Sequence, residues 1–517
     1  MRFTTDTRIK EIKNTGNLTI PSGAVVYYVA NDGSDTNDGR SDQAPFKTIE
    51  KVNSVLSRYG SGNQTAVYVC FKRGDVWRGE RLDACDNLTV TAYGTGAKPV
   101  IMGSPENGGG SANASKWVEV EPNIWRYEGS QNWGDVGNIV FNDGEGYAKK
   151  IIQLYVKNSG SSSYRITDYT NGNGQQYVFN SYTDLKNDLD FYHDKDFDGG
   201  SGATGYLYIY STINPALRFE SIEFAPHVNL LYIRGTAGND KIVIDNICFK
   251  YSGGHAISAQ GVDTDSVTDF TVQNCEFGWI GGSIQTRIKA SVIGTEDVVY
   301  DVRYGNAIEI YGACDGFTVK NNYIYQVFDA GITVQKTMSS GDGDYSQKNV
   351  LWTQNVIENC NYSVEYFLTK IPNGNDSIMS NFQITDNLMW NSGTGFCETR
   401  GVWDRGFSAH IKCQFSSPCN KADNFVISGN TMVGISGSFI QIRNSYGVDS
   451  MPLFENNTLY GYYDFEGEAD QGYRIGEVRV TSDGEQIWTP YDTNIDAYLA
   501  ENMGSKYGED NKYYFIF

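Results

Sequence analysis

The stretch Val319-Lys-Asn-Asn-Tyr-Ile324 shows the short pattern that decides the fold, because it recurs through the C-terminal half of the chain. The pattern has six positions. The first and the sixth are apolar, and the fourth is often Asn. The fourth positions of the copies are residues 247, 275, 322, 355, 387, 430 and 457. Their spacing indicates a base period near 27 residues that loops lengthen. Internal repetition on this scale is typical of solenoid architectures.

Short strands joined by one repeated turn predict a parallel β-solenoid. Asn at the same turn of successive coils can stack its side-chain amides into a ladder, which satisfies buried polar groups of the turn. The competing interpretation is a β-sandwich with Greek-key turns. A sandwich has no reason to repeat one Asn-rich turn seven times along the chain.

The composition restricts the possible partners of this 517-residue chain. Lys and Arg total 41 against 62 Asp and Glu, which gives a formal net charge of −21. A nucleic-acid-binding surface needs a basic stripe, so nucleic acid is not expected as a partner. The sequence lacks the uninterrupted apolar run of about 18 residues that a membrane helix requires, so no membrane partner is expected. The sequence does not distinguish a monomer from a homo-oligomer.

The cysteines indicate a reducing environment. The chain has 9 cysteines, and an odd number cannot pair completely. Most stand at wide intervals inside apolar, strand-like runs, the usual place for small buried hydrophobic residues. No CxxC motif supports a zinc site. The first residues lack the apolar stretch of a signal peptide, so the cytoplasm is favoured over secretion with the signal removed.

Four N-terminal segments carry a second signal: Tyr27–Gly39, Ala44–Asn53, Phe71–Gly79 and Tyr93–Ile101. They resemble the first coils of bacterial right-handed parallel β-helix proteins that act on carbohydrates, the pectate-lyase-like superfamily. The resemblance implies an all-β, right-handed parallel β-helix, with residues 46–56 as an amphipathic helix that caps its open end. The superfamily contains glycoside hydrolases and polysaccharide lyases, so the resemblance is specific for the fold and loose for the reaction.

The same resemblance implies a domain organisation. Residues 1–115 would form the N-terminal cap and the first coils, and residues 116–220 a small inserted β subdomain. Residues 221–465 would form the central and C-terminal coils that carry the site, and residues 466–517 a C-terminal extension. Within the central coils, Arg303–Ile310, Phe328–Gln335 and Tyr362–Tyr366 resemble coils of that family.

Stacked coils bring acidic residues that are distant in sequence onto one wall. Alternation along aligned strands places Glu309, Thr333, Glu365 and Gln441 on the outer face in one column, about 4.8 Å apart per coil. Asp329 falls beside residues 303–306 of the previous coil. Two carboxylates on one face are what glycoside hydrolysis needs, one as acid and one as base or nucleophile. We therefore predict Glu309, Asp329 and Glu365 as catalytic residues with their roles unassigned.

Other residues near this column are expected to bind the sugar. Polar side chains would hydrogen-bond its hydroxyl groups, and aromatic side chains would contact the apolar faces of its ring. The predicted substrate-binding residues are Arg303, Gln335, Glu398, Arg400, Trp279, Tyr304, Tyr366 and Trp403. The alternative is that the acids only form ion pairs with Arg303, Arg400 or Lys336, or face solvent.

Two other function classes remain open. A polysaccharide lyase would use Lys336, Lys370, Arg400 or Lys412 to neutralise a uronate or remove its α-proton. A column richer in acids than in bases would repel such a substrate, so a hydrolase is favoured. The third class is a non-catalytic glycan-binding protein. In each case the expected partner is a carbohydrate.

Three further motifs give little support to other functions. Gly254-His255 followed by Arg287-Ile-Lys is similar to part of the polygalacturonase pattern, but the acids upstream in that pattern are missing. Residues 194–199 resemble the start of a calcium loop, yet the twelfth position is Gly205 and supplies no bidentate Glu. The four histidines have no Ser or Cys motif around them, so a Ser-His-Asp hydrolase has no support. No cofactor is predicted, with Ca²⁺ at 194–199 as the alternative.

Overall fold

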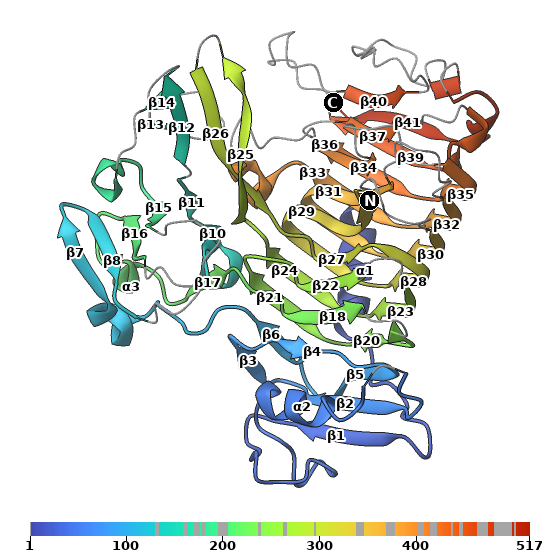
Figure 1. The fold of residues 1–517 in the computed structure, drawn as a ribbon, viewed down its shortest axis with the longest axis horizontal. Helices are drawn as coiled ribbons and strands as arrows, with labels where there is room; N and C mark the ends of the chain where they lie inside the picture. The colour runs from blue at the N-terminus through green and yellow to red at the C-terminus, as the bar shows by residue number, and fades with distance from the viewer. Residues whose placement is uncertain are drawn as a thin grey trace.

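The computed structural model shows a parallel β-helix to which a group of smaller sheets is attached (Figure 1). It describes residues 2–60, 62–129, 134–151, 153–158, 164–169, 176–177, 181–194, 205–235, 239–261, 266–293, 296–337, 346–368, 378–400, 408–413, 421–435, 438–443, 448–462, 474–479, 499–500 and 503–516. The all-β class and the solenoid architecture predicted from the repeat are confirmed.

Parallel strands stack along three faces of the solenoid, and two long strands turn the corner between two faces. The first face contains β1 (Val25–Val29), β2 (Val67–Lys72), β5 (Leu88–Tyr93), β19 (Asn239–Asp240), β20 (Val243–Asp245), β23 (Ser266–Gln273), β28 (Ala313–Lys320), β30 (Ser346–Thr353), β32 (Ile378–Thr385), β35 (Lys421–Ser428) and β38 (Leu453–Glu455).

The second face follows the Asn turn in each coil. It contains β3 (Val76–Arg78), β6 (Val100–Met102), β21 (Cys248–Ser252), β24 (Glu276–Ile280), the first halves of β29 (Tyr323–Lys336) and β31 (Val356–Leu368), β33 (Leu388–Ser392), β36 (Thr431–Ile435), β39 (Thr458–Tyr462) and β41 (Lys512–Ile516). The third face contains β4 (Leu82–Asp83), β18 (Leu231–Gly235), β22 (Ile257–Gly261), β27 (Ile308–Tyr311), the second halves of β29 and β31, β34 (Ala409–Cys413), β37 (Ser438–Arg443) and β40 (Arg474–Arg479).

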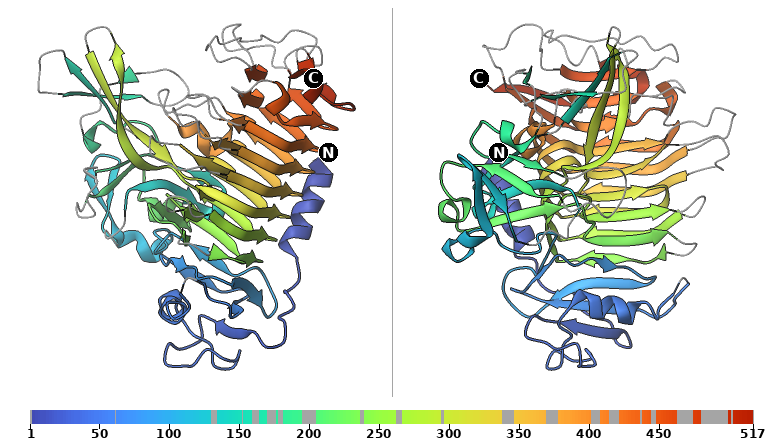
Figure 2. Two further views of the ribbon diagram at one scale, coloured as in Figure 1. Left: turned by 45° about the vertical axis from the view of Figure 1, so that its right-hand side comes forward. Right: turned by 60° about the vertical axis from the view of Figure 1, so that its left-hand side comes forward.

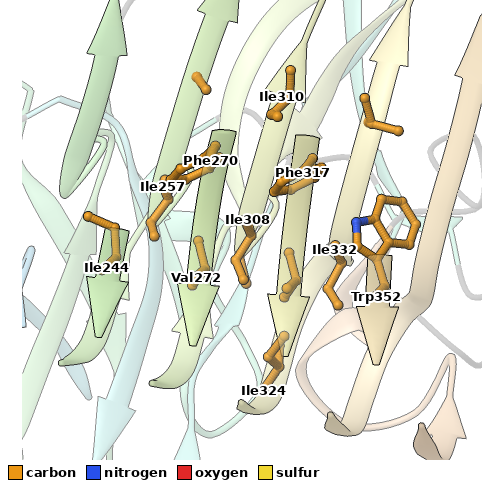
Figure 3. Packing of buried hydrophobic residues seen from close by; sticks show 14 of the residues in the cluster. Ile244, Ile257, Phe270, Val272, Ile308, Ile310, Phe317, Ile324, Ile332 and Trp352 are labelled. Carbon is orange, nitrogen blue, oxygen red and sulfur yellow. The ribbon is translucent and has the colours of Figure 1, made fainter. Parts of the chain in front are cut away.

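The interior of the coils is a continuous column of apolar side chains. Equivalent positions of successive coils stack on one another, as Ile257, Ile308 and Ile332 do in Figure 3. Phe270 stacks on Phe317 with a ring separation of 5.5 Å. Because each coil buries its apolar side chains only against its neighbours, stability is spread along the solenoid.

The repeated Asn turn forms the predicted ladder. The side chains of Asn322, Asn355, Asn387, Asn430 and Asn457 are fully buried. Each accepts hydrogen bonds from the coil before it; for example, Asn355 Oδ1 accepts the Asn322 backbone N–H and side-chain amide, both at 3.0 Å. The residue before each ladder Asn has a left-handed backbone, as at Asn321 (φ 55°) and Gly429 (φ 70°). This explains why Asn, Asp and Gly recur there, since they tolerate positive φ best.

Two helices cover the solenoid. Helix α2 (Ile49–Leu56) begins after Thr48, whose hydroxyl accepts the Lys51 N–H, and buries four apolar residues over the first coils. It is the predicted capping helix. Helix α1 (Arg2–Lys13) runs along the outside of the coils (Figure 2) and was not predicted. Ile9 and Ile12 pack against Val356 of the second face.

The segment between the early coils and residue 226 forms separate sheets on one side of the solenoid (Figure 1). One sheet contains β7 (Trp117–Glu121), β8 (Ile124–Tyr127), β16 (Leu207–Tyr210), β15 (Asp190–His193) and β11 (Lys149–Lys150). A second contains β10 (Gly146–Tyr147), β9 (Val136–Phe141) and β17 (Ile222–Pro226). A third joins β14 (Gln176–Tyr177), β13 (Tyr164–Tyr169) and β12 (Gln153–Asn158) to a hairpin of the solenoid, β25 (Ser283–Ile293) and β26 (Glu296–Tyr304).

Short helices complete the described chain: α3 (Pro215–Arg218), η1 (Ser111–Lys116), η2 (Asn142–Gly144), η3 (Tyr182–Asp184), η4 (Gly395–Thr399), η5 (Val448–Ser450) and η7 (Gly504–Lys506). None of the helices in the described ranges could cross a membrane. The cysteines in those ranges are buried and form no disulfide, as expected for small hydrophobic residues.

Candidate active site

A column of polar side chains points away from the apolar core on the third face, and all its members except Lys412 are less than 5% exposed. Strand register pairs its members in the order Ser258, Glu309, Thr333, Glu365, Lys412 and Gln441. The predicted alignment of Glu309, Thr333, Glu365 and Gln441 is therefore present, and Lys412 fills the coil between the last two.

Glu398 does not belong to this column. The chain leaves the strand conformation at Gly393 (φ 83°) and Gly395 (φ 80°) and forms helix η4, in which Glu398 is exposed. Its Oε1 accepts the Gly395 N–H at 3.1 Å. Glu398, predicted as a substrate-binding residue near the column, is not one of its members, because two glycines with positive φ end the strand there.

Asp329 lies in a β-bulge at the corner between the second and third faces. Val327 pairs with Cys360 and Ala330 with Tyr362, so two residues of β29 oppose one residue of β31. The Asp329 N–H donates to the Gly305 carbonyl at 3.2 Å, which places Asp329 beside the previous coil as predicted. Bulges of this kind re-aim a side chain and are frequent next to active sites.

Arg400 fixes the Asp329 carboxylate. Its Nη1 atom lies 2.9 Å from Asp329 Oδ1 and also donates to the Phe328 carbonyl at 3.3 Å. The Asp329 side chain keeps 18% of its surface exposed, whereas that of Arg400 keeps 7%. Arg400 was predicted to bind the sugar; in the structure it holds an acid.

Glu365 and Lys412 form a nearly buried pair, with Lys412 Nζ 2.6 Å from Glu365 Oε1. Burial raises the pKa of Glu365, and the negative charge of Asp329 raises it further, although Lys412 opposes both. Burial alone would lower the pKa of Lys412, but the attraction of Glu365 outweighs it and the pKa is raised. The Lys412 ammonium also lies 3.8 Å from the centre of the Tyr362 ring. Desolvation and a neighbouring acid both favour the protonated form of a carboxyl group.

Glu309 is held by amide groups. Its Oε2 atom accepts from Asn306 Nδ2 at 2.5 Å and from Gln335 Nε2 at 3.0 Å. Asn306 Oδ1 in turn accepts the Ala330 N–H at 2.8 Å, which ties the carboxylate to the next coil. Glu309 as a whole is only 4% exposed. Gln335, predicted to bind the sugar, thus orients an acid and remains half-buried.

Tyr304 lies at the open edge of this group. Its hydroxyl is 2.7 Å from His227 Nε2, and its ring meets the His255 ring edge to face at 4.9 Å. Tyr304 is half-buried and His227 is exposed. Tyr304 is therefore accessible, as its predicted role in shaping the pocket requires.

The prediction that Arg303 binds the sugar does not agree with its position in the structure. Its side chain is fully buried and donates to the Thr399 carbonyl. Its guanidinium lies 4.4 Å from the centre of the Phe328 ring, and that of Arg400 lies 4.8 Å from the same centre. Two guanidinium groups around one ring fix the bulge and helix η4 rather than a ligand.

Two of the predicted aromatic contacts are also wrong. Tyr366 is 1% exposed and packs inside the solenoid, 4.9 Å from the Phe425 ring centre, because it follows the outward Glu365 by one residue. Trp279 has a left-handed backbone (φ 61°) at a corner and is buried with Phe396 between the solenoid and the attached sheets. Trp403 lies outside the described residues.

Several groups at the site were not predicted or were assigned to another chemistry. Lys412 was considered only as a lyase residue, although alternation in Ala409–Cys413 indicates that it points outward. Asn306 stands in the same coil as Glu309, and no motif marks it. His255 stands in the coil before, and in the sequence only the polygalacturonase-like pattern marks it. His227 reaches the site from the segment that follows β17, so only the three-dimensional structure reveals it. Lys370 and the calcium-like loop after Asp194 lie outside the described residues.

Comparison with known proteins gives distant structural matches. No protein-family model and no curated protein matches the chain. A solved structure described as a glycoside hydrolase has 11% identity and a TM-score of 0.46, with coverage of 89% of this chain and 95% of its own. XylC in complex with xylose has 13% identity and a TM-score of 0.40, with coverage of 95% and 82%. A GH136 lacto-N-biosidase from Eubacterium ramulus has 10% identity and a TM-score of 0.34, with coverage of 100% and 70%. Matches this distant carry no argument about the site, which is interpreted from its own geometry.

Proposed function

We propose that this protein is a glycoside hydrolase that cleaves a poly- or oligosaccharide, with Glu365 as general acid and Asp329 as base or nucleophile. The observation that carries the proposal is a buried Glu365, its pKa raised by desolvation and by Asp329, beside a partly exposed Asp329. Two carboxyl groups with different environments are the usual arrangement for acid and base work at a glycosidic bond. The outward Glu309, also predicted as catalytic, is proposed to orient the sugar.

The surrounding groups fit these roles. As Glu365 gives its proton to the leaving oxygen, it becomes a carboxylate, and Lys412 at 2.6 Å stabilises the charge that forms. Arg400 holds Asp329 in place, so that its free oxygen can take a proton from water or attack the anomeric carbon. Positioning by buried cations that do not touch the sugar explains why Arg400 and Lys412 expose little surface.

The parallel coils and the N-terminal segments support membership of the pectate-lyase-like superfamily, which we include in the proposal. A polysaccharide lyase is the second candidate, because Lys412, Arg400 and Tyr362 gather at the same place. Both cations are already paired with carboxylates, however, so neither is available to neutralise a uronate without breaking an ion pair.

A substrate panel tests the proposal. Wild-type protein is incubated with nitrophenyl glycosides and with uronate-containing polysaccharides, and released nitrophenol, reducing ends and the ultraviolet absorbance of unsaturated uronides are measured. A hydrolase releases nitrophenol or reducing ends without that absorbance. Unsaturated products would establish the lyase, and binding without turnover would establish the glycan-binding class.

Variants then test the assigned residues. Glu365→Gln and Asp329→Asn are each expected to lower kcat by about 10²-fold to 10⁴-fold, the usual contribution of a general acid or base. Glu398→Gln is the matched control, since this glutamate is exposed on η4 and its carboxylate accepts the Gly395 N–H instead of contacting the acid pair. Circular dichroism checks that each variant folds. Unchanged kcat in both Glu365→Gln and Asp329→Asn would refute the assignment.

A further inference from the structure

The open edge of the site contains a second polar group that the acid pair does not use. Glu309, His255, Tyr304 and His227 form a continuous series across it. His255 Nδ1 lies 3.4 Å from Glu309 Oε2, the His255 and Tyr304 rings are in contact, and the Tyr304 hydroxyl lies 2.7 Å from His227 Nε2. His227, at the outer end, is exposed to solvent.

The hydrogen bonds assign the protons of this series. His255 Nδ1 accepts the Asn306 backbone N–H at 3.0 Å, so it carries no proton and cannot donate to Glu309. The Ile284 backbone favours a proton on the His227 ring. With that proton on Nδ1, Nε2 of the neutral ring accepts the hydrogen of Tyr304 over 2.7 Å.

Tyr304 therefore keeps its proton and offers its oxygen to a ligand. Burial raises the pKa of Tyr304 well above its usual value, and the charge of Glu309 adds to this effect. A phenol that stays protonated is not a base for removing a proton from the substrate, so its role is positioning. Glu309 likewise presents hydrogen-bond acceptors, and the amide donors from Asn306 and Gln335 both bind its Oε2 atom, not Oε1.

We infer that Glu309, Tyr304 and His227 form a subsite for the hydroxyl groups of an uncharged sugar ring. The inference rests on the proposed function and deepens it. The hydroxyl groups of the sugar donate to the Tyr304 oxygen and to the Glu309 carboxylate. The carboxylate of a uronate would instead face the negative charge of Glu309. The nearby Lys150 does not change this balance, because its Nζ atom is buried 2.5 Å from Asp135.

Acid is expected to disrupt the subsite. The groups that act on His227 are Asp135, His255 and Lys150, together with the hydrogen-bonded Tyr304. Partial desolvation lowers the pKa of His227. The charge of Asp135 raises this pKa, whereas His255 and Lys150 lower it further. When His227 takes up a proton, Nε2 becomes a donor and the Tyr304 hydrogen must turn toward the substrate. The acceptor that the sugar hydroxyl needs is then lost.

The test uses matched pairs of nitrophenyl sugars, each a neutral hexoside and the uronide that differs from it only at C6. Steady-state rates give kcat and KM, and calorimetry gives binding to the Glu365→Gln variant. Wild-type protein should prefer the hexoside, and Glu309→Gln should reduce that preference. Tyr304→Phe should raise KM or Kd for the hexoside by about threefold to tenfold, the worth of one neutral hydrogen bond, with kcat changed by less than about twofold.

His227→Gln distinguishes positioning from a purely structural role. Gln retains a hydrogen-bond acceptor for Tyr304 but does not titrate, so it should keep KM near neutral pH and abolish the rise of KM in acid. The control is Tyr206→Phe, because Tyr206 is an exposed tyrosine directly before β16. This substitution should change neither KM nor its dependence on pH.

The outcomes separate this inference from the hydrolase proposal. If no glycoside is cleaved but Tyr304→Phe weakens binding of a hexoside, the hydrolase proposal fails and the subsite stands. If Tyr304→Phe and wild-type protein bind the hexosides equally, or if uronides bind better, or if no sugar of the panel binds, the subsite is refuted. Unchanged acid dependence in His227→Gln would refute the role of His227.

Discussion

The Asn ladder and the outer column have the same spacing, one side chain per coil, but they contain different functional groups. Both place one side chain per coil at a fixed position over successive coils. In the ladder that side chain is the same amide in five neighbouring coils, from Asn322 to Asn457, and each amide is hydrogen-bonded to the next. In the column the six positions carry four different functional groups: hydroxyls, carboxylates, an ammonium and an amide.

The satisfaction of hydrogen bonds differs as well. Ladder amides use both their donors and their acceptor. Along the column, the hydroxyls of Ser258 and Thr333 are buried without a partner among the described residues. Uniform, satisfied repetition is what stability requires, whereas mixed and partly unsatisfied groups are typical of functional surfaces. The comparison predicts that ladder positions govern folding and that charged column positions govern both folding and activity.

The largest effect on stability is expected from Lys412→Met. Removing the ammonium leaves Glu365 buried without its partner, so the side chain either takes up a proton or remains as an unpaired charge. At a pH where Glu365 stays charged, the free energy of unfolding should fall by about 3–5 kcal/mol. Urea denaturation followed by fluorescence measures this. The double variant Lys412→Met/Glu365→Leu should recover most of the loss, because no unpaired charge remains. A single variant as stable as wild type at every pH would contradict a buried ion pair, whereas a loss confined to higher pH is expected if Glu365 takes up a proton.

A ladder substitution should cost somewhat less. Asn387→Ala removes the acceptor of the Asn355 backbone N–H and the donor to the Trp352 carbonyl, so two buried backbone groups lose their partners. We expect a loss of about 2–4 kcal/mol in the free energy of unfolding. Asn511→Ala, at the partly buried end of the ladder, should lose only about half as much. Equal losses would contradict the view that the ladder acts through burial.

Acid should destabilise the solenoid through His410. This buried histidine has hydroxyl partners at Nδ1, Ser363 at 3.0 Å and Ser392 at 2.9 Å, and its Nε2 bonds to the Gly434 carbonyl. Burial lowers the pKa of His410 to about 3, against 6.5 in its ordinary state.

Between these two pH values the unfolded chain binds a proton that the folded protein does not. The free energy of unfolding should therefore fall by about 1.4 kcal/mol for each unit of pH below 6.5, reaching its full loss near pH 3. Denaturation at a series of pH values measures the slope. His410→Gln should show a shallower slope than wild type, and an identical slope would assign the acid sensitivity to other groups.

The smallest effect is expected from Thr333→Val. This substitution keeps the shape of the side chain and removes a hydroxyl that has no partner among the described residues. The free energy of unfolding should stay the same or rise by up to about 1 kcal/mol, the opposite direction from the ladder variant. Thermal unfolding by calorimetry checks the sign. A clear loss of stability would mean that the hydroxyl is hydrogen-bonded after all.

Much of the fold follows from local patterns in the sequence. The Asn turn, the inward Ile308, Ile332 and Val364, and the cap at α2 are each determined by neighbouring residues and by the repeat. Helix α1 escaped prediction because its apolar side consists mainly of Ile9 and Ile12. Ion pairs with residues hundreds of positions away complete its contacts, and no local pattern encodes such partners.

The site was predictable where strand alternation applies and not elsewhere. Alternation places Glu309 and Glu365 correctly, and applied consistently it would have placed Tyr366 inside and Lys412 outside. It fails at corners, where bulges and positive φ angles reset the direction of the side chains, as at Asp329 and Trp279. It also cannot show that His227 returns from the attached sheets to meet Tyr304.

Helix α1 imposes an order on the assembly of the molecule. Its contacts run backward along the solenoid: Lys13 reaches Glu276, Arg8 reaches Asn321, and Arg2 reaches Glu358, while Thr5 binds Trp390. During synthesis helix α1 leaves the ribosome before the coils that it contacts, and Trp390 is made more than three hundred residues after Lys13. The contacts of the helix can therefore form only as the coils that carry Glu276, Asn321, Glu358 and Trp390 are added. Complete docking of helix α1 thus requires every coil up to Trp390.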